Sequence, residues 1–315
     1  MPSVRASQPD ATEEAIAVEI DTRLHKPGVA GSSPAAAIEY SDCVIDHCSN
    51  EEYHARPGIS SSQLKELALS PAAFYRRYVK GIAPPKSSEA LSFGTLLHQW
   101  GELGDGLFWQ NVKPIPVEKL TVTGQVGKEA KEYIKTLPPG VMAISPSDHN
   151  KLWNQTRQIL NNGAARRILD DTVDREFNIA WKWHGHDCRV RCDGATEKFI
   201  YDFKTTSDVD PRWTFHSSVR KWRYDIQAAF YGEAAVAAGW EPHSMVFIIC
   251  STVEPYHCHV ARLPDVIVAR GRRRCLALLN EIQRRKEWDC WTPEDYGQIH
   301  ELYCPRYMLE EGSDW

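Results

Sequence analysis

The stretch from Glu176 to Thr206 constrains the fold of this chain more than any other. Its alternating apolar residues, interrupted by turn residues, predict three short strands joined by two tight turns. The expected strands are 177–183, about 187–193 (stopping at Gly194) and 199–205. Because adjacent antiparallel strands lie about 5 Å apart, side chains at facing positions of the second and third strands can meet at one point.

Two aspartates are expected to face each other there, since Asp193 ends the second strand and Asp202 lies in the third. Their carboxylates would repel each other without a positive charge between them, and a hard divalent cation such as Mg²⁺ takes oxygen ligands of this kind. Lys204 shares a face of its strand with Asp202, because side chains alternate along a strand. Its ammonium could orient a metal-bound water, help to deprotonate it, or stabilise charge on a phosphate.

The plain alternative is that Asp202 and Lys204 form an ordinary surface salt bridge, as most D-x-K triplets do. The residues around the pair argue against this, because idle charges are disfavoured in an apolar strand. That strand contains Phe199, Ile200, Tyr201 and Phe203.

The order of these motifs resembles the PD-(D/E)xK nuclease superfamily. An aspartate at the end of one strand precedes Asp202-Phe203-Lys204, and Gln227 and Tyr231 follow on a helix. An upstream histidine, His98 in Gly-Thr-Leu-Leu-His, is similar to that of the RecB-like branch. The segments 59–64 and 70–74 resemble the exonuclease VIII (RecE-type) family of phage and prophage recombination nucleases, and the resemblance covers about residues 53 to 290.

This resemblance implies an α/β fold with a restriction-endonuclease-like core, in which helices flank a mixed central sheet. It implies one or two Mg²⁺ ions, for which Mn²⁺ can substitute. The implied metal ligands are His98, Asp193, Asp202 and the Phe203 carbonyl, and the implied catalytic residues are Lys204, Asp202, Asp193 and Glu176.

His98 and Glu176 each have a simpler interpretation. His98 lies beside the apolar face of a helix expected at 88–103, in which Gly94 is expected to allow close packing. A lone histidine at such a place is usually a core or boundary residue whose hydrogen bonds are satisfied. Neutral imidazole is also a ligand that suits Mn²⁺, and the resemblance favours this role for His98. Glu176 is expected either to bind a second metal or its water, or to be a surface charge at the start of a strand.

The resemblance also implies four residues of this chain that contact DNA. Gln227 and Tyr231 lie four residues apart on one helix face and would contact DNA or support the phosphate, or else serve only as capping and packing groups. Arg76 and Arg77 lie near the expected DNA entry and would contact phosphates, although a basic group of this kind is more often a solvated helix face.

The implied activity is a Mg²⁺-dependent DNA exonuclease that hydrolyses phosphodiester bonds from duplex DNA ends, in the 5′-to-3′ direction, in phage-type recombination or DNA repair. The family also implies a ring-shaped homo-oligomer and a single-strand annealing recombinase as partner. The alternatives are a single-strand exonuclease or endonuclease of the same superfamily, and a non-catalytic DNA-binding protein.

The first 50 residues are expected to form a disordered acidic tail, and residues 51–315 the exonuclease domain. Residues 1–60 contain ten acidic and four basic residues, a net charge of −6, whereas the whole chain has −5. The remaining residues therefore carry a net charge of +1, and the acidic balance does not argue against a nucleic-acid partner.

Nine cysteines are an odd number without framework spacing and are expected to be reduced thiols in the cytoplasm. No C-x-x-C motif is present, so no iron–sulfur cluster is expected. Cys188 and Cys192 have the opposite strand parity to Asp193 and are expected in the core. The chain has no run of 18 apolar residues and no basic-then-apolar N-terminus, so neither a membrane span nor a secretory signal is expected.

Overall fold

The structure, a computed structural model, describes residues 43–82, 89–240, 245–292 and 297–299. The tail expected over residues 1–50 therefore lies largely outside the described residues. Its last part contains strand β1 (Val44–Asp46), which pairs with β4. The central sheet thus takes an edge strand from the segment that was assigned to the tail.

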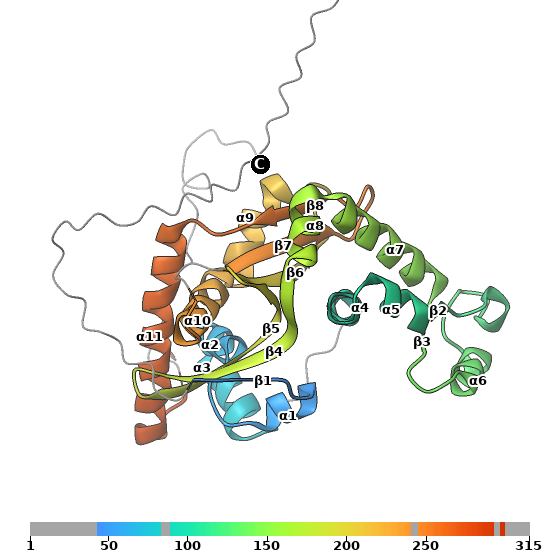
Figure 1. The fold of residues 1–315 in the computed structure, drawn as a ribbon. Coiled ribbons are helices and arrows are strands. Elements are labelled where there is room, and N and C mark those ends of the chain that lie inside the picture. The colour runs from blue at the N-terminus through green and yellow to red at the C-terminus, as the bar shows by residue number, and fades with distance from the viewer. Residues whose placement is uncertain (1–42, 83–88, 241–244, 293–296, 300–315) are drawn as a thin grey trace, which may run out of the picture. The chain divides into compact units, whose positions relative to one another are not determined.

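A mixed sheet of six strands forms the centre of the described chain (Figure 1). In spatial order its strands are β1, β4 (Thr172–Trp183), β5 (His186–Thr196), β6 (Ile200–Thr206), β7 (Met245–Ser251) and β8 (Cys258–Ala261). Strands β6 and β7 run parallel, and every other neighbouring pair in this sheet is antiparallel. The predicted α/β fold with a mixed central sheet is confirmed.

Strand β5 does not stop at Gly194 as the sequence suggested, but continues to Thr196. Residues 194 and 195 still pair with β6, and residue 194 is glycine because the ring of Tyr201 crosses the position where a side chain would stand. A Cβ there would lie 2.8 Å from Tyr201 Cε1 and closer still to its hydroxyl. The last registered pair towards the open end is Gly194–Tyr201, and beyond it β5 and β6 separate. Asp193 and Asp202 lie at this point of separation.

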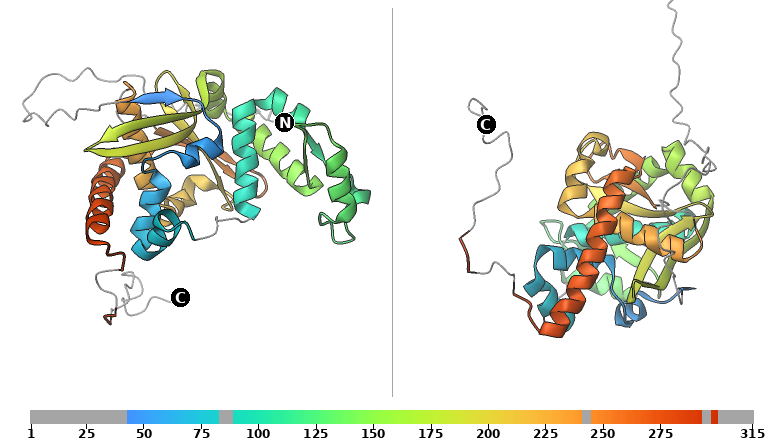
Figure 2. Two further views of the ribbon diagram at one scale, coloured as in Figure 1. Left: turned by 90° about the horizontal axis from the view of Figure 1, so that it is seen from below. Right: turned by 90° about the vertical axis from the view of Figure 1, so that its left-hand side faces the viewer.

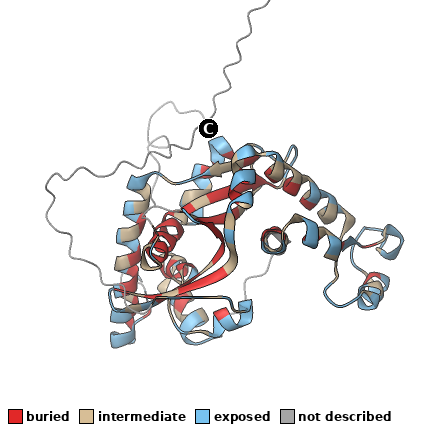
Figure 3. Cartoon of the chain, in the orientation of Figure 1, coloured by how far each residue is buried: buried red, intermediate tan, exposed pale blue. Residues whose placement is uncertain are grey.

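Helices cover both faces of the sheet (Figures 1 and 2). One layer consists of α2 (Ser61–Leu69), α10 (Tyr224–Ala237) and α11 (Asp265–Trp288), and the other of α4 (Glu89–Leu103), α7 (Pro146–Asn161) and α8 (Gly163–Asp170). Helix α10 lies directly on β4, β5 and β7, and residues 225–235 of this helix are all buried (Figure 3). Its alanines allow this close approach to the sheet.

The other elements lie at the periphery or connect these layers. They are α1 (Asn50–Ala55), α3 (Pro71–Phe74), a π-helix (Tyr75–Val79), α5 (Asp105–Asn111), α6 (Lys128–Thr136), α9 (Pro211–Lys221), a 3₁₀ turn (Val117–Lys119) and a small parallel pair of β2 (Val112–Pro114) with β3 (Met142–Ile144). Among the helices that the structure describes, none combines the length and hydropathy needed to cross a bilayer.

The close approach of α4 to the sheet occurs at Gly101, and not at Gly94 as the sequence suggested. A Cβ at Gly94 would only make an ordinary contact, 3.9 Å from Thr205 Oγ1. A Cβ at Gly101 would clash with the Phe203 ring, whose Cδ2 and Cζ atoms would lie 3.1 and 3.2 Å away. Gly101 therefore sets the distance between β6 and the helix that carries His98.

Replacing Gly101 with alanine is expected to push α4 away from Phe203. Forcing a methyl group into a packed contact typically costs about 1–3 kcal/mol. The free energy of unfolding, measured by urea denaturation, should therefore fall by that amount in Gly101→Ala.

The control is Gly106→Ala in α5, where nothing lies within 4 Å of the added Cβ. Alanine is the better helix former, so this variant should be neutral or more stable. Equal stability of the two variants would contradict the close packing at Gly101.

Candidate active site

Asp193 joins three elements at the point where β5 and β6 separate. Its Oδ1 lies 2.9 Å from Nδ1 of His98, which α4 contributes. Its Oδ2 accepts a hydrogen bond of 2.7 Å from the backbone N–H of Phe203 on β6. The carboxylate replaces the ladder hydrogen bond that the separating strands no longer form, and it is therefore held at both oxygens. Asp193 is buried among these partners.

Glu176 on β4 completes a cluster with His98 and Asp193. One ligand atom from each of these three side chains lies within 4.8 Å of the others. Glu176 has a φ angle of 47° and is the one residue inside a strand with positive φ among those the structure describes. Such a backbone conformation is strained for any residue other than glycine and often occurs at functional sites. Glu176 thus belongs to the candidate site, although the sequence left open that it is only a surface charge.

Asp202 lies beside this cluster and has different partners. Its Oδ2 forms an ion pair with Nζ of Lys204, and its Oδ1 accepts a 2.7 Å hydrogen bond from Nε2 of Gln227. The ion pair confirms that residues 202 and 204 share one face of β6. Asp202 is buried, so this contact is not the solvent-exposed salt bridge that was the plain alternative.

The two aspartates differ in proton affinity. Burial alone would raise the pKa of Asp193. His98 and then Lys204 lower it by more than burial raises it, so this pKa lies below the usual aspartate value. For Asp202, burial together with the nearby charge of Asp193 outweighs Lys204, and the pKa is raised. The Lys204 ammonium is desolvated too, yet Asp202 and the other surrounding charges raise its pKa above the usual lysine value.

The other two cluster residues hold protons near neutral pH. Burial alone would lower the pKa of His98, but Asp193 raises it to about 9. Burial and the charge of Asp193 raise the pKa of Glu176 to about 7, although Arg191 opposes this with a 2.8 Å hydrogen bond to Oε2. The protonated imidazole therefore carries the positive charge that balances Asp193.

The donor set fits a divalent cation. Two carboxylates and one imidazole nitrogen, all close together and partly or fully buried, are ligands that Mg²⁺ and especially Mn²⁺ accept. A cation would supply the positive charge that the His98 proton supplies without it. In the part of the chain that the structure describes, no other group of three such residues meets the same distance condition.

The predicted DNA-contacting residues have different environments. Gln227 and Tyr231 are buried, and Tyr231 donates a 2.8 Å hydrogen bond from its hydroxyl to the carbonyl of Arg191. Both side chains thus support residues of the site from α10. Arg76 is exposed, whereas Arg77 is only partly exposed and lies 3.6 Å from Oε1 of Glu66. Of these four residues, Arg76 is the one whose side chain is open to a phosphate.

Two basic residues near the site, Arg191 and Lys65, were not among the predicted ones. Arg191 holds Glu176, and strand alternation could have indicated it, because residues 191 and 193 share a face of β5. Lys65 donates a 2.8 Å hydrogen bond to Oε1 of Gln227 from a position 162 residues away in the chain. No local pattern reveals that contact.

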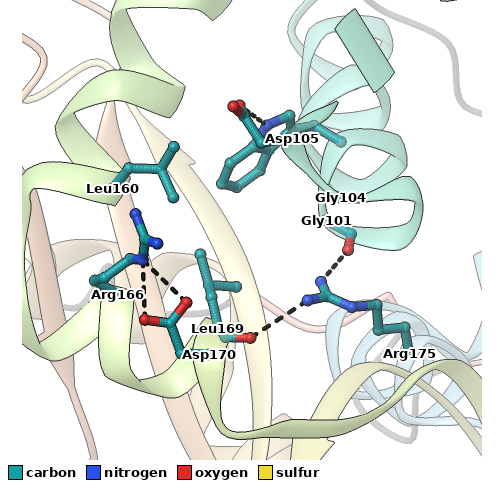
Figure 4. Close-up of a pocket in the computed structure, with 9 residues that line it drawn as sticks. Gly101, Gly104, Asp105, Leu160, Arg166, Leu169, Asp170 and Arg175 are labelled. Atoms are coloured by element: carbon teal, nitrogen blue, oxygen red, sulfur yellow. Dashed lines mark hydrogen bonds and ion pairs between the residues drawn. The ribbon is translucent and has the colours of Figure 1, made fainter. Parts of the chain in front are cut away.

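A pocket of about 230 Å³ lies beside the end of α4 and contains none of the predicted site residues (Figure 4). Arg175 crosses it and donates hydrogen bonds to the carbonyl oxygens of Gly101 and Leu169. Arg175 contacts Gly101 at the end of α4 and directly precedes Glu176 on β4. It therefore links the helix that carries His98 to this strand. The residues around this pocket therefore help to position the site, and the pocket itself is not the site.

Comparison with known proteins agrees with this fold. The profile of the family described as a PDDEXK-like domain of unknown function (DUF3799) matches residues 60–299, and the chain belongs to this family. A solved structure from Eubacterium rectale, provisionally described as an exonuclease, is similar with a TM-score of 0.55 at 15% sequence identity. The similarity covers 84% of this chain and 99% of that one, and it shows a shared fold. No curated protein matches the sequence.

Metal binding at the cluster is expected to release protons. A ligand imidazole must be neutral and a ligand carboxylate ionised, whereas without metal His98 is protonated below pH 9 and Glu176 below pH 7. Binding should therefore release about two protons below the lower pKa and about one between the two values. Apparent Mn²⁺ affinity should rise with pH over this range.

Calorimetry in buffers of different ionisation enthalpy measures this release directly. In Glu176→Gln the proton release that depends on the Glu176 pKa of about 7 should disappear, and the release that depends on the His98 pKa of about 9 should remain. A Mn²⁺ affinity that does not change between about pH 6 and about pH 8.5 would contradict the assigned ligands.

Proposed function

We propose that this protein is a divalent-metal-dependent DNA exonuclease that hydrolyses phosphodiester bonds from the ends of duplex DNA. The observation that supports this most strongly is the cluster of His98, Glu176 and Asp193 directly beside the Asp202–Lys204 pair. The family membership supports the class of chemistry, since PD-(D/E)xK is the motif of a nuclease superfamily.

The proposed ligands are His98, Asp193, Asp202 and the Phe203 carbonyl, together with Glu176, whose carboxylate lies in one cluster with His98 and Asp193. A bound Mg²⁺ or Mn²⁺ would lower the pKa of a water molecule and offset the charge that develops on the phosphate. The protein contributes the negative charge that retains the cation, and the hydrogen bonds to Asp193 and Asp202 fix the ligands in place. Helix α4 brings in His98 at a distance set by Gly101.

Lys204 is proposed to act as a hydrogen-bond donor and positive charge. Its pKa is raised above the usual lysine value, so Nζ keeps its proton at neutral pH and is a poor base. The ammonium lies 5.2 Å from the centroid of the Tyr224 ring, which limits its movement on that side. Orienting the attacking water and stabilising phosphate charge are the roles that a fixed ammonium suits.

The remaining assignments rest on the resemblance to RecE-type nucleases. We infer a 5′-to-3′ direction, a ring-shaped homo-oligomer and an annealing recombinase as partner, in phage-type recombination or repair. Arg76 is the proposed phosphate contact. Arg77, Gln227 and Tyr231 would affect DNA binding indirectly, by holding neighbouring residues in place. The cysteines favour a reducing, cytoplasmic compartment.

Digestion of linear duplex DNA, labelled at one 5′ end or one 3′ end, tests the proposed activity. With Mg²⁺ the label at the 5′ end should be released first as nucleotides, and EDTA should stop the reaction. Circular duplex should stay intact. Cutting of the circle would indicate an endonuclease, and degradation of single strands alone would indicate a single-strand exonuclease.

Replacing Lys204 with alanine is expected to lower kcat by about 100-fold or more, because it removes a preorganised positive charge at the reacting phosphate. The matched control is Lys198→Ala, which removes an exposed lysine from the turn before β6 and should keep full activity. Full activity in Lys204→Ala would refute the role assigned to this residue.

A further inference from the structure

We propose that Lys65 is a positioning residue of this site, which acts through Gln227 to hold Asp202 in its working orientation; the inference rests on the function proposed above. None of the motifs that define the site contains Lys65. The residue belongs to α2, which packs against α10 within the same layer of helices.

Three side chains form a continuous chain of hydrogen bonds. Nζ of Lys65 donates to Oε1 of Gln227 at 2.8 Å, and Nε2 of Gln227 donates to Oδ1 of Asp202 at 2.7 Å. The other oxygen of Asp202 pairs with Lys204. Asp202 is thus held at one oxygen by a residue of its own strand and at the other by a chain that begins on a different helix.

The chemistry of the three groups fixes the direction of this chain. An ammonium has only donors and an ionised carboxylate has only acceptors, whereas a side-chain amide has one end of each kind. With Lys65 on one side and Asp202 on the other, only one orientation of the Gln227 amide satisfies both neighbours. The Asp202 carboxylate sets this orientation, and Lys65 stabilises it by donating to Oε1 of Gln227, which Nζ can do as an ammonium or as a neutral amine. Gln227 and Asp202 are both buried, so little water is available to replace a lost partner.

Helix α2 is well placed to carry such a residue. Ser60 and Gln63 form a capping box at its start, in which the Ser60 N–H donates to Oε1 of Gln63 at 2.9 Å. Leu64 and Leu67 are buried and fix the helix on the core. The segment that resembled the RecE-type family thus anchors the helix from which Lys65 reaches the site.

Lys65 also lies in a costly electrostatic position. Its Nζ is 5.2 Å from the centroid of the Tyr224 ring, and so is Nζ of Lys204. Burial and then the charge of Lys204 lower the pKa of Lys65 to about 7. Positive charges that share one aromatic ring repel each other, and the hydrogen bond from Lys65 to Gln227 offsets part of this repulsion.

A double-mutant cycle tests whether Lys65 acts through Gln227. The proteins are wild type, Lys65→Met, Gln227→Met and the double variant, and Mn²⁺ affinity is measured by calorimetry. Each single variant should bind Mn²⁺ about 10-fold more weakly, as for other residues that orient a metal ligand. The double variant should be no weaker than Gln227→Met alone.

Kinetics on labelled duplex DNA provide a second readout. Because the proposed effect passes through Asp202, Lys65→Met should lower kcat at limiting Mn²⁺, recover it at high Mn²⁺, and leave KM for DNA unchanged. Lys65→Arg, which keeps the donor, should restore most of the Mn²⁺ affinity. The control Lys113→Met removes an exposed lysine of β2 and should change neither quantity.

The outcomes separate the inference from the proposed function. If wild type cleaves DNA and binds Mn²⁺ but the two losses multiply to about 100-fold in the double variant, Lys65 acts independently and the inference is wrong. Unchanged Mn²⁺ affinity in Lys65→Met, or a raised KM alone, also overturns it. If Lys65→Met does not fold by circular dichroism, Lys65→Gln takes its place in the cycle. A wild-type protein that neither binds Mn²⁺ nor cleaves DNA refutes the proposed function itself.

Discussion

Three carboxylates lie close together on neighbouring strands of the central sheet, and the structure depends on balancing their negative charge. Glu176, Asp193 and Asp202 come from three neighbouring strands, and the last two are buried. Desolvated charges of one sign are unfavourable unless opposite charges and hydrogen bonds compensate them. Each carboxylate accordingly has its own basic partner: Arg191 for Glu176, His98 for Asp193 and Lys204 for Asp202.

This balance explains why elements distant in sequence meet here. Helix α4 supplies an imidazole, and Gly101 lets it come close enough to reach Asp193. Helix α10 places an amide against Asp202, and its alanine-rich, fully buried surface makes that approach possible. A divalent cation would replace the protons now held by His98 and Glu176. Under the proposed function, the site would give up these two protons when it takes up the cation.

The sequence was informative where the relevant geometry is local. Strand alternation correctly put Asp202 and Lys204 on one face, because two residues of one strand need no tertiary information. The nearness of Asp193 to β6, which its hydrogen bond with the Phe203 N–H shows, followed from a short turn between adjacent strands. Arg191 could have been found by the same argument.

Contacts between distant segments were not predictable in this way. Gly194 looks like a strand end, but in the fold it is a strand residue that must be glycine because the Tyr201 ring lies across it. The positive φ of Glu176 and the reach of Lys65 to Gln227 both depend on the assembled fold. The close approach of α4 was expected at Gly94 and occurs two turns later, because the position of Phe203 decides it.

The most direct test of the central claim is an anomalous difference map from a crystal of this protein soaked in Mn²⁺. The account predicts a peak between the side chains of His98, Glu176 and Asp193, close to the Asp202 carboxylate. A peak elsewhere, or an unoccupied cluster in crystals of a protein that binds Mn²⁺ in solution, would contradict it.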